Sequence, residues 1–507
     1  MRLSRRGFIQ RSSAMAAASV LPIGCSDSSN HSQRDSGRAI IIGSGFAGSV
    51  AALRLAEAGI RSIVLERGRK WTVEGYDTFP TTASLDKRAS WTIPPAGSES
   101  KGTAYAGLLE TISGPNVSAV CGACVGGGSL VYGGVLIQPP KDTFESVFPY
   151  LSYDAMSNIY YPRVIAQIGA SPIPDDVLAS PNYSAQRTFI RDVEAAGYTA
   201  LKPAASFNWD IIRREIAGEI PAAASVGEYP FGCNSGAKQS TDTNYLKLAV
   251  ASGLSELRSL TEVEMITERS PRGYTVTCRS ITADGELLER YALEADYLFM
   301  AAGSMNTTKL LLKSQQSGEL NGANPQIGQQ WGTNGDQLLA QLHPNVNAAP
   351  QGGPACIAAE DRSNANHPVT FMHSPLAFGT LQLQLAMSVP DESGRLSYDA
   401  VNDAMQINWN TDTDTPSAIA RQTSFNRLVA QNGGTEVPFI EGQIWHPLGG
   451  AVMGDACDEI GQLYGYRDLF VVDGSLLPGS AATVNPALTV AANAERIMEA
   501  LIPSLQG

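Results

Sequence analysis

The clearest hydrophobic pattern lies near the start of the chain, in residues 38–68. A short all-apolar run, residues 39–42, is followed by small residues and then by apolar residues at helical spacing up to Gly59. A second apolar run, residues 63–65, comes next. A buried strand, a helix and another buried strand produce this order of positions. The pattern therefore predicts a strand–helix–strand unit.

The same alternation returns twice further along the chain. Residues 295–312 pass from an apolar strand through a turn at Gly303 into a helix. Residues 469–501 give a strand, an Asp473-Gly474 turn, a loop and a helix from about Pro486. The first of these segments is typical of a further crossover on the same sheet, and the repeated order of strand, turn and helix predicts an α/β fold.

A glycine motif marks the turn after the first predicted strand. Gly43, Gly45 and Gly48 form GxGxxG, and Glu66 ends the second strand. Gly43 permits a tight turn, Gly45 lets a pyrophosphate approach the backbone, and Gly48 lets helix and sheet pack closely. Glu66 is suited to accept hydrogen bonds from ribose hydroxyls. This segment predicts a dinucleotide site and leaves NAD and FAD both open.

Composition narrows the class of partner. The chain of 507 residues is long enough for two or more domains or one discontinuous arrangement. Its formal net charge of -13 would repel nucleic acid and anionic membrane, so we expect neither as the main partner. Cys121 and Cys124 form one CxxC without a second ligand pair at zinc-like spacing, so we expect two small residues in a tight loop and no metal.

The first 25 residues differ from the rest of the chain. Arg5 and Arg6 precede a short Ala-rich apolar stretch and resemble a twin-arginine export signal. Lipidation of Cys25 and cleavage nearby with loss of this residue both remain open. The polar residues 26–37 would form a flexible linker. We expect a periplasmic, secreted or lipid-anchored protein, in the last case associated with the membrane periphery.

A second glycine cluster favours FAD over NAD. Residues 121–135 contain Gly126, Gly127 and Gly128 with Ser129 and little charge. A nicotinamide domain does not need this cluster, whereas a long FAD requires further backbone that approaches it closely. The first turn of the helix after Pro486 is suited to aim N–H groups at a flavin carbonyl.

The order of these motifs resembles the glucose/methanol/choline oxidoreductases, and within them the bacterial cholesterol oxidases that bind FAD without a covalent bond. The motifs are GxGxxG, GGGSLV followed by Gly-Gly, HPLGG, DGS and NP, and the likeness extends over residues 38–505. The resemblance implies a Rossmann-like FAD-binding domain assembled from residues 38–146, 222–312 and 441–507. It also implies a substrate-binding domain with a mainly antiparallel sheet above the active site, residues 147–221 and 313–440.

The resemblance gives a role to His446, which on its own, between Trp445 and Pro447, would favour a structural histidine. It implies that His446 and Asn485 lie over the flavin. Histidine is suited to take or orient the hydroxyl proton, and Asn485 to hold the substrate oxygen. The FAD-binding residues that the motifs and the resemblance imply are Gly43, Gly45, Phe46, Gly48, Glu66, Gly122, Gly126, Gly127, Gly128, Ser129, Val263, Gly303, Asp473, Gly474, Asn485 and Pro486.

One departure concerns a second base. The relatives carry an active-site glutamate in a segment of the form F-x-E, which moves the double bond of the ketone product. The matching residues 368–387 contain no carboxylate, and the alignment places His373 near the glutamate position. His373 as the second base and His373 as a misaligned loop residue both remain open.

These observations lead to one main hypothesis and two alternatives. We expect an FAD-dependent alcohol oxidase, a monomer, that oxidises the 3β-hydroxyl of cholesterol or a related sterol with O2 as acceptor, with or without isomerisation. The first alternative is a dehydrogenase of another bulky apolar alcohol with a different electron acceptor. The second is a sterol-binding lipoprotein without turnover.

Overall fold

The computed structural model describes residues 39–95, 103–346, 351–376, 380–410 and 415–506. The predicted export signal, Cys25 and the polar linker lie outside these residues. Residues 37–507 fall within one compact unit. No helix in the described ranges is long and apolar enough to cross a membrane.

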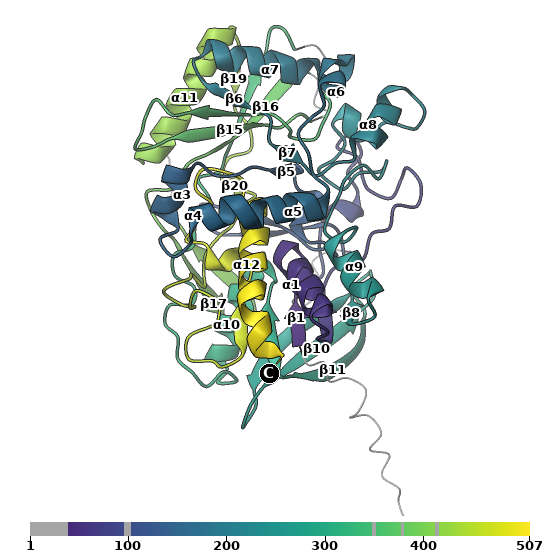
Figure 1. Cartoon of the computed structure of the whole chain (residues 1–507), viewed down its shortest axis with the longest axis vertical. Helices are drawn as coiled ribbons and strands as arrows, with labels where there is room; N and C mark the ends of the chain where they lie inside the picture. Colours follow the sequence, from purple (N-terminus) through teal and green to yellow (C-terminus); the bar gives the residue numbers. More distant parts are fainter. Residues whose placement is uncertain (1–38, 96–102, 347–350, 377–379, 411–414, 507) are drawn as a thin grey trace, which may run out of the picture. The chain divides into compact units, whose positions relative to one another are not determined.

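The fold has two halves, each built around one sheet and each made of segments far apart in the sequence. A five-stranded parallel sheet forms the centre of the first half (Figure 1). Its order is β21-β12-β1-β2-β8, with bounds Leu469–Val471, Tyr297–Met300, Ala39–Ile42, Ser62–Leu65 and Ser255–Arg258. The predicted strand–helix–strand unit is confirmed as β1, helix α1 (Phe46–Glu57) and β2. The two later strand–turn–helix segments are confirmed as β12 with α10 (Gly303–Gln316) and β21 with α12 (Ala487–Leu505).

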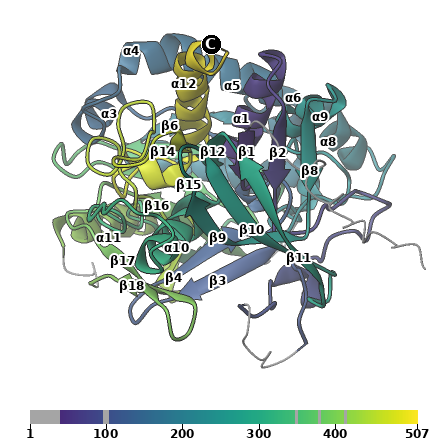
Figure 2. The same cartoon turned by 90° about the horizontal axis from the view of Figure 1, so that it is seen from below.

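Layers cover both sides of this sheet, as Figure 2 shows. On one side lie α1, α12 and α9 (Tyr245–Ala251), and α1 packs against the other two. On the other side lies an antiparallel sheet of β9 (Thr261–Glu268), β10 (Tyr274–Ile281) and β11 (Leu287–Ala295). Because both faces are covered, the parallel strands can be apolar throughout, which is why the sequence shows them as unbroken apolar runs.

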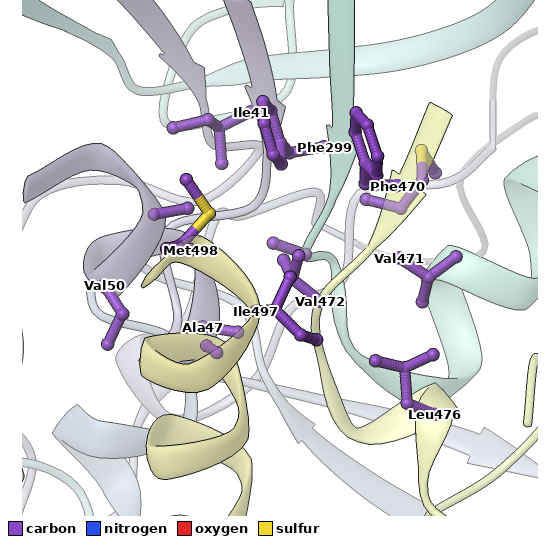
Figure 3. Close-up of a cluster of buried hydrophobic side chains, with 14 of the residues drawn as sticks. Ile41, Ala47, Val50, Phe299, Phe470, Val471, Val472, Leu476, Ile497 and Met498 are labelled. Atoms are coloured by element: carbon purple, nitrogen blue, oxygen red, sulfur yellow. The ribbon is translucent and has the colours of Figure 1, made fainter. Parts of the chain in front are cut away.

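The core between sheet and helices is built from side chains far apart in the sequence (Figure 3). Ile41, Phe299 and Phe470 come from three neighbouring strands, and Val50 and Met498 come from α1 and α12. Phe299 and Phe470 stack with ring centroids 5.3 Å apart. Each of these side chains is at most 3% exposed, so the C-terminal helix closes the core that the N-terminal unit begins.

A six-stranded sheet dominates the second half. Its order is β19-β13-β16-β15-β14-β6, and all its pairs are antiparallel. The bounds are Thr435–Val437, Gln337–Leu342, Leu381–Met387, Val369–His373, Ala358–Asp361 and Thr199–Leu201. Helices α7 (Ser184–Ala195) and α11 (Pro416–Asn432) pack on one face of it (Figure 1). All six strands come from the segments predicted for the substrate-binding domain.

Shorter elements complete the fold. The strands are β3 (Leu109–Ser113), β4 (Ser118–Gly122), β5 (Val135–Leu136), β7 (Ala204–Ala205), β17 (Arg395–Asp399), β18 (Ala404–Asn408) and β20 (Gln443–Ile444). The helices are α2 (Gly128–Val131), α3 (Lys141–Val147), α4 (Tyr153–Ala155), α5 (Tyr161–Ile168), α6 (Asp175–Ala179) and α8 (Trp209–Ile216). Helix α5 packs against α12 in the first half, although its residues fall in the segment predicted for the substrate domain.

Candidate active site

A cavity of about 670 Å³ is lined by residues from both halves of the fold. Its walls include the turns that follow β1 and β12, the loop before α2, and the face of the six-stranded sheet that points away from α7 and α11. The carboxyl ends of parallel strands and the covering sheet therefore meet at one place, which is where ligands bind in open α/β sheets.

The GxGxxG turn has the geometry that the sequence predicts. Gly43 has φ +103°, and a side chain there would begin 2.2 Å from the carbonyl oxygen of Ala301. A Cβ on Gly48 would lie 2.1 Å from the carbonyl oxygen of Gly43. Gly45 is open by comparison, since its added Cβ would meet only Gly127, at 3.9 Å. Gly43 and Gly48 thus close the turn, and Gly45 leaves backbone free toward the cavity.

Glu66 lines the cavity in a fixed orientation. Its Oε2 accepts hydrogen bonds from the backbone N–H of Ser44 (3.1 Å) and from Ser44 Oγ (2.7 Å). Its Oε1 accepts from the N–H of Gly68 (2.9 Å). The carboxylate is therefore held against the glycine turn, where a ribose would follow a bound pyrophosphate. Ser44, the unspecified second position of the motif, is a supporting residue that the motif alone does not indicate.

Asp473, which follows β21, connects the C-terminal segment to the start of α10. Its Oδ2 accepts from the N–H of Gly303 (2.8 Å) and from Thr307 Oγ1 (2.6 Å), and its Oδ1 accepts from the N–H of Ser475 (2.9 Å). Burial raises the pKa of Asp473, and the hydrogen bonds from Ser475, Thr307 and Gly303 act in the opposite direction. This carboxylate fixes the start of α10 at the cavity wall.

Most residues predicted to bind FAD line this cavity, and three lie behind its wall. The lining residues are Gly43, Gly45, Phe46, Glu66, Gly122, Gly127, Gly128, Val263, Gly303, Asp473, Gly474, Asn485 and Pro486. Gly48, Gly126 and Ser129 are instead supporting residues. Ser129 Oγ, for example, donates to the carbonyl of Gly126 (2.6 Å) and accepts from the N–H of Thr241 (2.9 Å). Side-chain-free backbone along one continuous wall, with an acid at Glu66, fits a long dinucleotide such as FAD.

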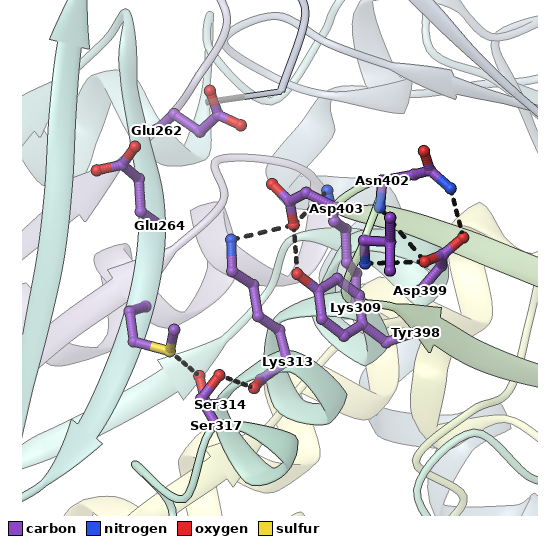
Figure 4. A network of polar contacts seen from close by, with 12 residues as sticks. Glu262, Glu264, Lys309, Lys313, Ser314, Ser317, Tyr398, Asp399, Asn402 and Asp403 are labelled. Carbon is purple, nitrogen blue, oxygen red and sulfur yellow. Dashed lines mark hydrogen bonds and ion pairs between the residues drawn. The ribbon is translucent and has the colours of Figure 1, made fainter. Parts of the chain in front are cut away.

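Charged side chains line the part of the cavity that follows α10 beyond Gly303 (Figure 4). Asp403 Oδ1 lies 3.0 Å from Lys313 Nζ and 3.5 Å from Lys309 Nζ, and it accepts from Tyr398 Oη at 2.8 Å. Burial alone would raise the pKa of Asp403, but the lysine charges and the tyrosine hydrogen bond outweigh burial and lower it. The positive and negative groups here largely pair with one another.

The cysteines of the CxxC sequence are free thiols, as are the other four described cysteines. Cys124 is buried beside the glycine cluster, and Cys121 lines the cavity. Burial raises the pKa of Cys121 to about 12, so its thiol stays protonated at neutral pH.

His446 and Asn485, far apart in the sequence, meet at the other part of the cavity. Asn485 Nδ2 lies 3.3 Å from His446 Nε2, and both residues line the cavity. On its other side, His446 Nδ1 lies 2.8 Å from Oδ1 of Asp336, whose side chain is fully buried. Asn485 Oδ1 is buried without a hydrogen-bond partner among the described residues. An imidazole and an amide therefore lie side by side at the cavity wall, the two groups that can take the proton of an alcohol hydroxyl and donate a hydrogen bond to its oxygen.

The covering sheet gives this part of the cavity an apolar roof. Strands β13, β15 and β16 contribute Leu338, Met372 and Leu385, and the chain after β15 contributes Ser374 and Leu376. Among the described lining residues, every carboxylate comes from elements of the other half or from the β17–β18 hairpin. The roof suits the hydrocarbon body of a substrate and offers it no charge.

The interpretation of His373 as a second base is wrong. His373 is at the end of β15, fully buried, and its ring stacks on Phe189 of α7 with centroids 4.9 Å apart. Its neighbours Met372 and Ser374 line the cavity, whereas His373 does not. Because successive side chains of a strand point to opposite faces, one residue of misalignment moves a candidate base out of the site.

Sequence reasoning also missed Asp336, which holds His446. The residue lies in the turn Gly332–Gln337, and no spacing to another acid or histidine marks it. Only its proximity to His446, 110 positions later, identifies it. The signal was limited to a carboxylate in a glycine-containing turn, which is common on protein surfaces.

Comparisons with known proteins agree with this geometry. A family model described as GMC oxidoreductase, N-terminal part, matches residues 38–331, and its C-terminal counterpart matches residues 391–494. A cholesterol oxidase of Mycobacterium tuberculosis is 26% identical over 90% of this chain and 89% of its own length. A cholesterol oxidase of Acinetobacter baumannii is 25% identical over 90% of this chain and 93% of its own length. An FAD-dependent oxidoreductase from Chaetomium thermophilum shares the fold, with a TM-score of 0.66, 14% identity and coverage of 92% of this chain and 99% of that one.

Proposed function

Because the chain belongs to the GMC oxidoreductase family, and is thus an FAD-dependent oxidoreductase acting on alcohols, we propose that its substrate is a bulky apolar alcohol, in the first place a sterol. One observation carries this proposal: His446 and Asn485, whose side chains meet at 3.3 Å, line the same cavity as the apolar roof. A hydroxyl can be held at the polar pair while the hydrocarbon body lies under the roof.

His446 and Asn485 have different roles at the substrate hydroxyl. His446 Nε2 takes the hydroxyl proton, and Asn485 Nδ2, which contacts Nε2 at 3.3 Å, donates instead to the substrate oxygen and holds it in place. Bound FAD would supply the acceptor for the hydride of the carbon that bears this hydroxyl. The apolar roof excludes water, which strengthens these polar contacts. We propose O2 as the acceptor that returns FAD to its oxidised state.

The sterol assignment is supported by the relatives and by the roof. Two relatives that span about nine-tenths of the chain are described as cholesterol oxidases, at 25–26% identity. Leu338, Met372, Leu376 and Leu385 offer aliphatic contacts to a rigid hydrocarbon. Burying apolar surface contributes roughly 25 cal/mol per Å², so a large hydrocarbon is favoured over a short alcohol.

We further propose that the product keeps its double bond in place. Moving a double bond requires a base on the substrate side of the cavity, and the roof supplies none among the described residues. His373, the candidate for that role, faces α7 instead. The expected product is therefore the ketone alone.

FAD is proposed to be held without a covalent bond. His446 is the single histidine among the described lining residues, and both its ring nitrogens already face Asp336 and Asn485. Acid precipitation should release all the flavin into the supernatant. Yellow colour that stays in the pellet would contradict this part of the proposal.

The test of the proposed function is anaerobic mixing of the flavin-loaded protein with a panel of alcohols. Cholesterol, another 3β-hydroxysterol, a long-chain primary alcohol and ethanol are compared by the loss of flavin absorbance. Rapid bleaching by the sterols, little by ethanol, and recovery on admission of air support a sterol oxidase. Slow recovery in air would indicate that an acceptor other than O2 re-oxidises the flavin. A flavin that stays oxidised with every alcohol would contradict the proposal. It would leave the alternative of a sterol-binding protein without turnover.

A further inference from the structure

Asp336 is buried directly behind His446 and uses both of its oxygens. Oδ2 accepts hydrogen bonds from the backbone N–H groups of Trp445 and His446, each at 3.0 Å. Oδ1 faces His446 Nδ1 at 2.8 Å, and the carboxylate has no exposed surface. An aspartate side chain that serves as acceptor on both oxygens requires the proton of the imidazole to be on Nδ1.

This placement of the proton decides how His446 and Asn485 interact. With Nδ1 as the donor, His446 Nε2 carries a lone pair and accepts from Asn485 Nδ2 at 3.3 Å. The amide of Asn485 is thereby oriented with its nitrogen toward the ring, and its Oδ1 is buried without a partner among the described residues. One carboxylate thus sets the direction of two hydrogen-bonding groups.

The same turn also holds the backbone that carries Asn485. Asn334, two residues before Asp336, accepts from the N–H of Ala481 (2.7 Å) and donates to the carbonyl of Val484 (3.0 Å). Between these two contacts, Ala482 and Thr483 have φ +59° and +71°, which non-glycine residues seldom adopt. The amide of Asn334 fixes this strained segment, so the turn Gly332–Gln337 positions both polar residues of the site.

We propose that Asp336 is a positioning residue that makes His446 Nε2 the proton acceptor for the substrate hydroxyl. The inference rests on the proposed alcohol oxidation, which it deepens by assigning the tautomer of the base and the residue that imposes that tautomer. Asp336 does not line the cavity and acts through the imidazole and, through it, on the amide of Asn485.

Asp336→Asn is the sharpest variant because it is nearly isosteric and reverses the tautomer. Two backbone N–H groups point at the Oδ2 position, so an amide NH2 there would set donor against donor. The amide oxygen therefore takes that position, and the NH2 group faces His446 Nδ1. Nδ1 must then accept, and the proton moves to Nε2, which can no longer take a proton from an alcohol. We expect flavin reduction to slow roughly 100- to 10,000-fold with flavin content unchanged.

A second buried Asp–His pair provides the matched control. Asp192 Oδ2 lies 2.7 Å from His343 Nε2, with exposed side-chain fractions of 6% and 0%, and neither residue lines the cavity. Asp192→Asn makes the same chemical change against the same partner type, away from the site. Its flavin should bleach at the wild-type rate, which separates loss of the base from general damage by a buried amide.

Nitrogen NMR of the flavin-loaded protein labelled with ¹⁵N-histidine gives a readout independent of turnover. The chain has five histidines, so the His446 signals can be assigned by comparison with His446→Gln. Wild type should show a protonated Nδ1 and a bare Nε2, and Asp336→Asn the reverse. An unchanged tautomer, or a wild-type bleaching rate in Asp336→Asn, would overturn the inference. If no alcohol reduces the wild-type flavin, the proposed function fails, but the NMR comparison still decides the role of Asp336.

Discussion

The two faces of the six-stranded sheet differ in polarity, and the apolar face is the one that borders the cavity. Leu338, Met372 and Leu385 point toward the cavity. The opposite face, under α7 and α11, carries a row of buried polar side chains: Gln341, Gln382, Gln384 and His373. These four polar side chains therefore lie where no substrate reaches them.

The buried row is only partly satisfied by its own members. Gln382 Oε1 accepts from Gln341 Nε2 (3.0 Å) and from Gln384 Nε2 (3.1 Å), while neither ring nitrogen of His373 has a partner among the described residues. His446, by contrast, has a partner on each nitrogen and an opening to the cavity. The comparison teaches that a histidine identifies a site when its partners hold it at a cavity wall, and not merely when it is buried.

The largest expected difference between the two regions is kinetic. His446→Ala removes the proton acceptor and should slow anaerobic flavin reduction by roughly 100-fold or more. His373→Leu, which fills a similar volume behind the sheet, should leave that rate near the wild-type value. Stopped-flow absorbance of both variants with the same sterol decides the point. Equal rates in wild type and His446→Ala would remove His446 from the mechanism.

A smaller effect is expected when the polarity of the roof is changed. Leu385→Gln gives the cavity face the side chain that Gln384 provides on the other face. An amide buried against a hydrocarbon without a partner costs about 1–3 kcal/mol, so kcat/KM for a sterol should fall roughly tenfold. Short alcohols, which do not reach the roof, should be unaffected. A uniform loss for all alcohols would indicate a distorted site instead.

The polar side chains under α7 and α11 should affect the free energy of unfolding and not the rate of flavin reduction. Burial lowers the pKa of His373 to about 3 from 6.5. The unfolded chain therefore binds a proton at His373 below pH 6.5, whereas the folded chain does not bind it until about pH 3. The contribution of neutral His373 to the free energy of unfolding is complete above pH 6.5 and is lost as the pH falls. From pH 7.5 to 5.5 the free energy of unfolding should drop by about 1.4 kcal/mol through this residue.

Urea unfolding of wild type and His373→Leu at these two pH values measures that contribution. The variant should lose less stability than wild type between pH 7.5 and 5.5. Equal losses in the two proteins would show that His373 gains a proton without unfolding, and so that it is less isolated than its surroundings indicate.

The smallest effect is expected at Gln384. Gln384→Leu removes one hydrogen bond to Gln382 and also one buried oxygen without a partner, so the two changes partly cancel. We expect the free energy of unfolding to change by less than about 1 kcal/mol and the rate of flavin reduction to stay the same. A large kinetic effect would connect the polar face to the active site.

Local sequence predicts the strand–turn–helix units that border the cavity well. Gly43, Gly45, Glu66 and Gly303 act where strand, turn and helix follow one another, and such units need only short-range information. His446 and Asn485 were predicted to meet through the resemblance, and they do lie 3.3 Å apart. Their relation to a flavin remains a prediction.

The substrate half depends on long-range register, which the sequence does not display. His373 faces α7 because β15 pairs with β16 in the register that opposes His373 to Gln384. A shift of one residue would have placed it in the cavity. Asp336 reaches His446 only after two distant loops pack together. Neither fact has a local pattern.

The most direct measurement is anaerobic bleaching of the flavin by a sterol that carries deuterium on its carbinol carbon. Transfer of hydride from that carbon, with His446 as the proton acceptor, predicts rapid bleaching by the ordinary sterol, slower bleaching by the deuterated one, and the slowest in His446→Ala. A flavin that stays oxidised with every sterol, or that bleaches at one rate with both isotopes in both proteins, would contradict it.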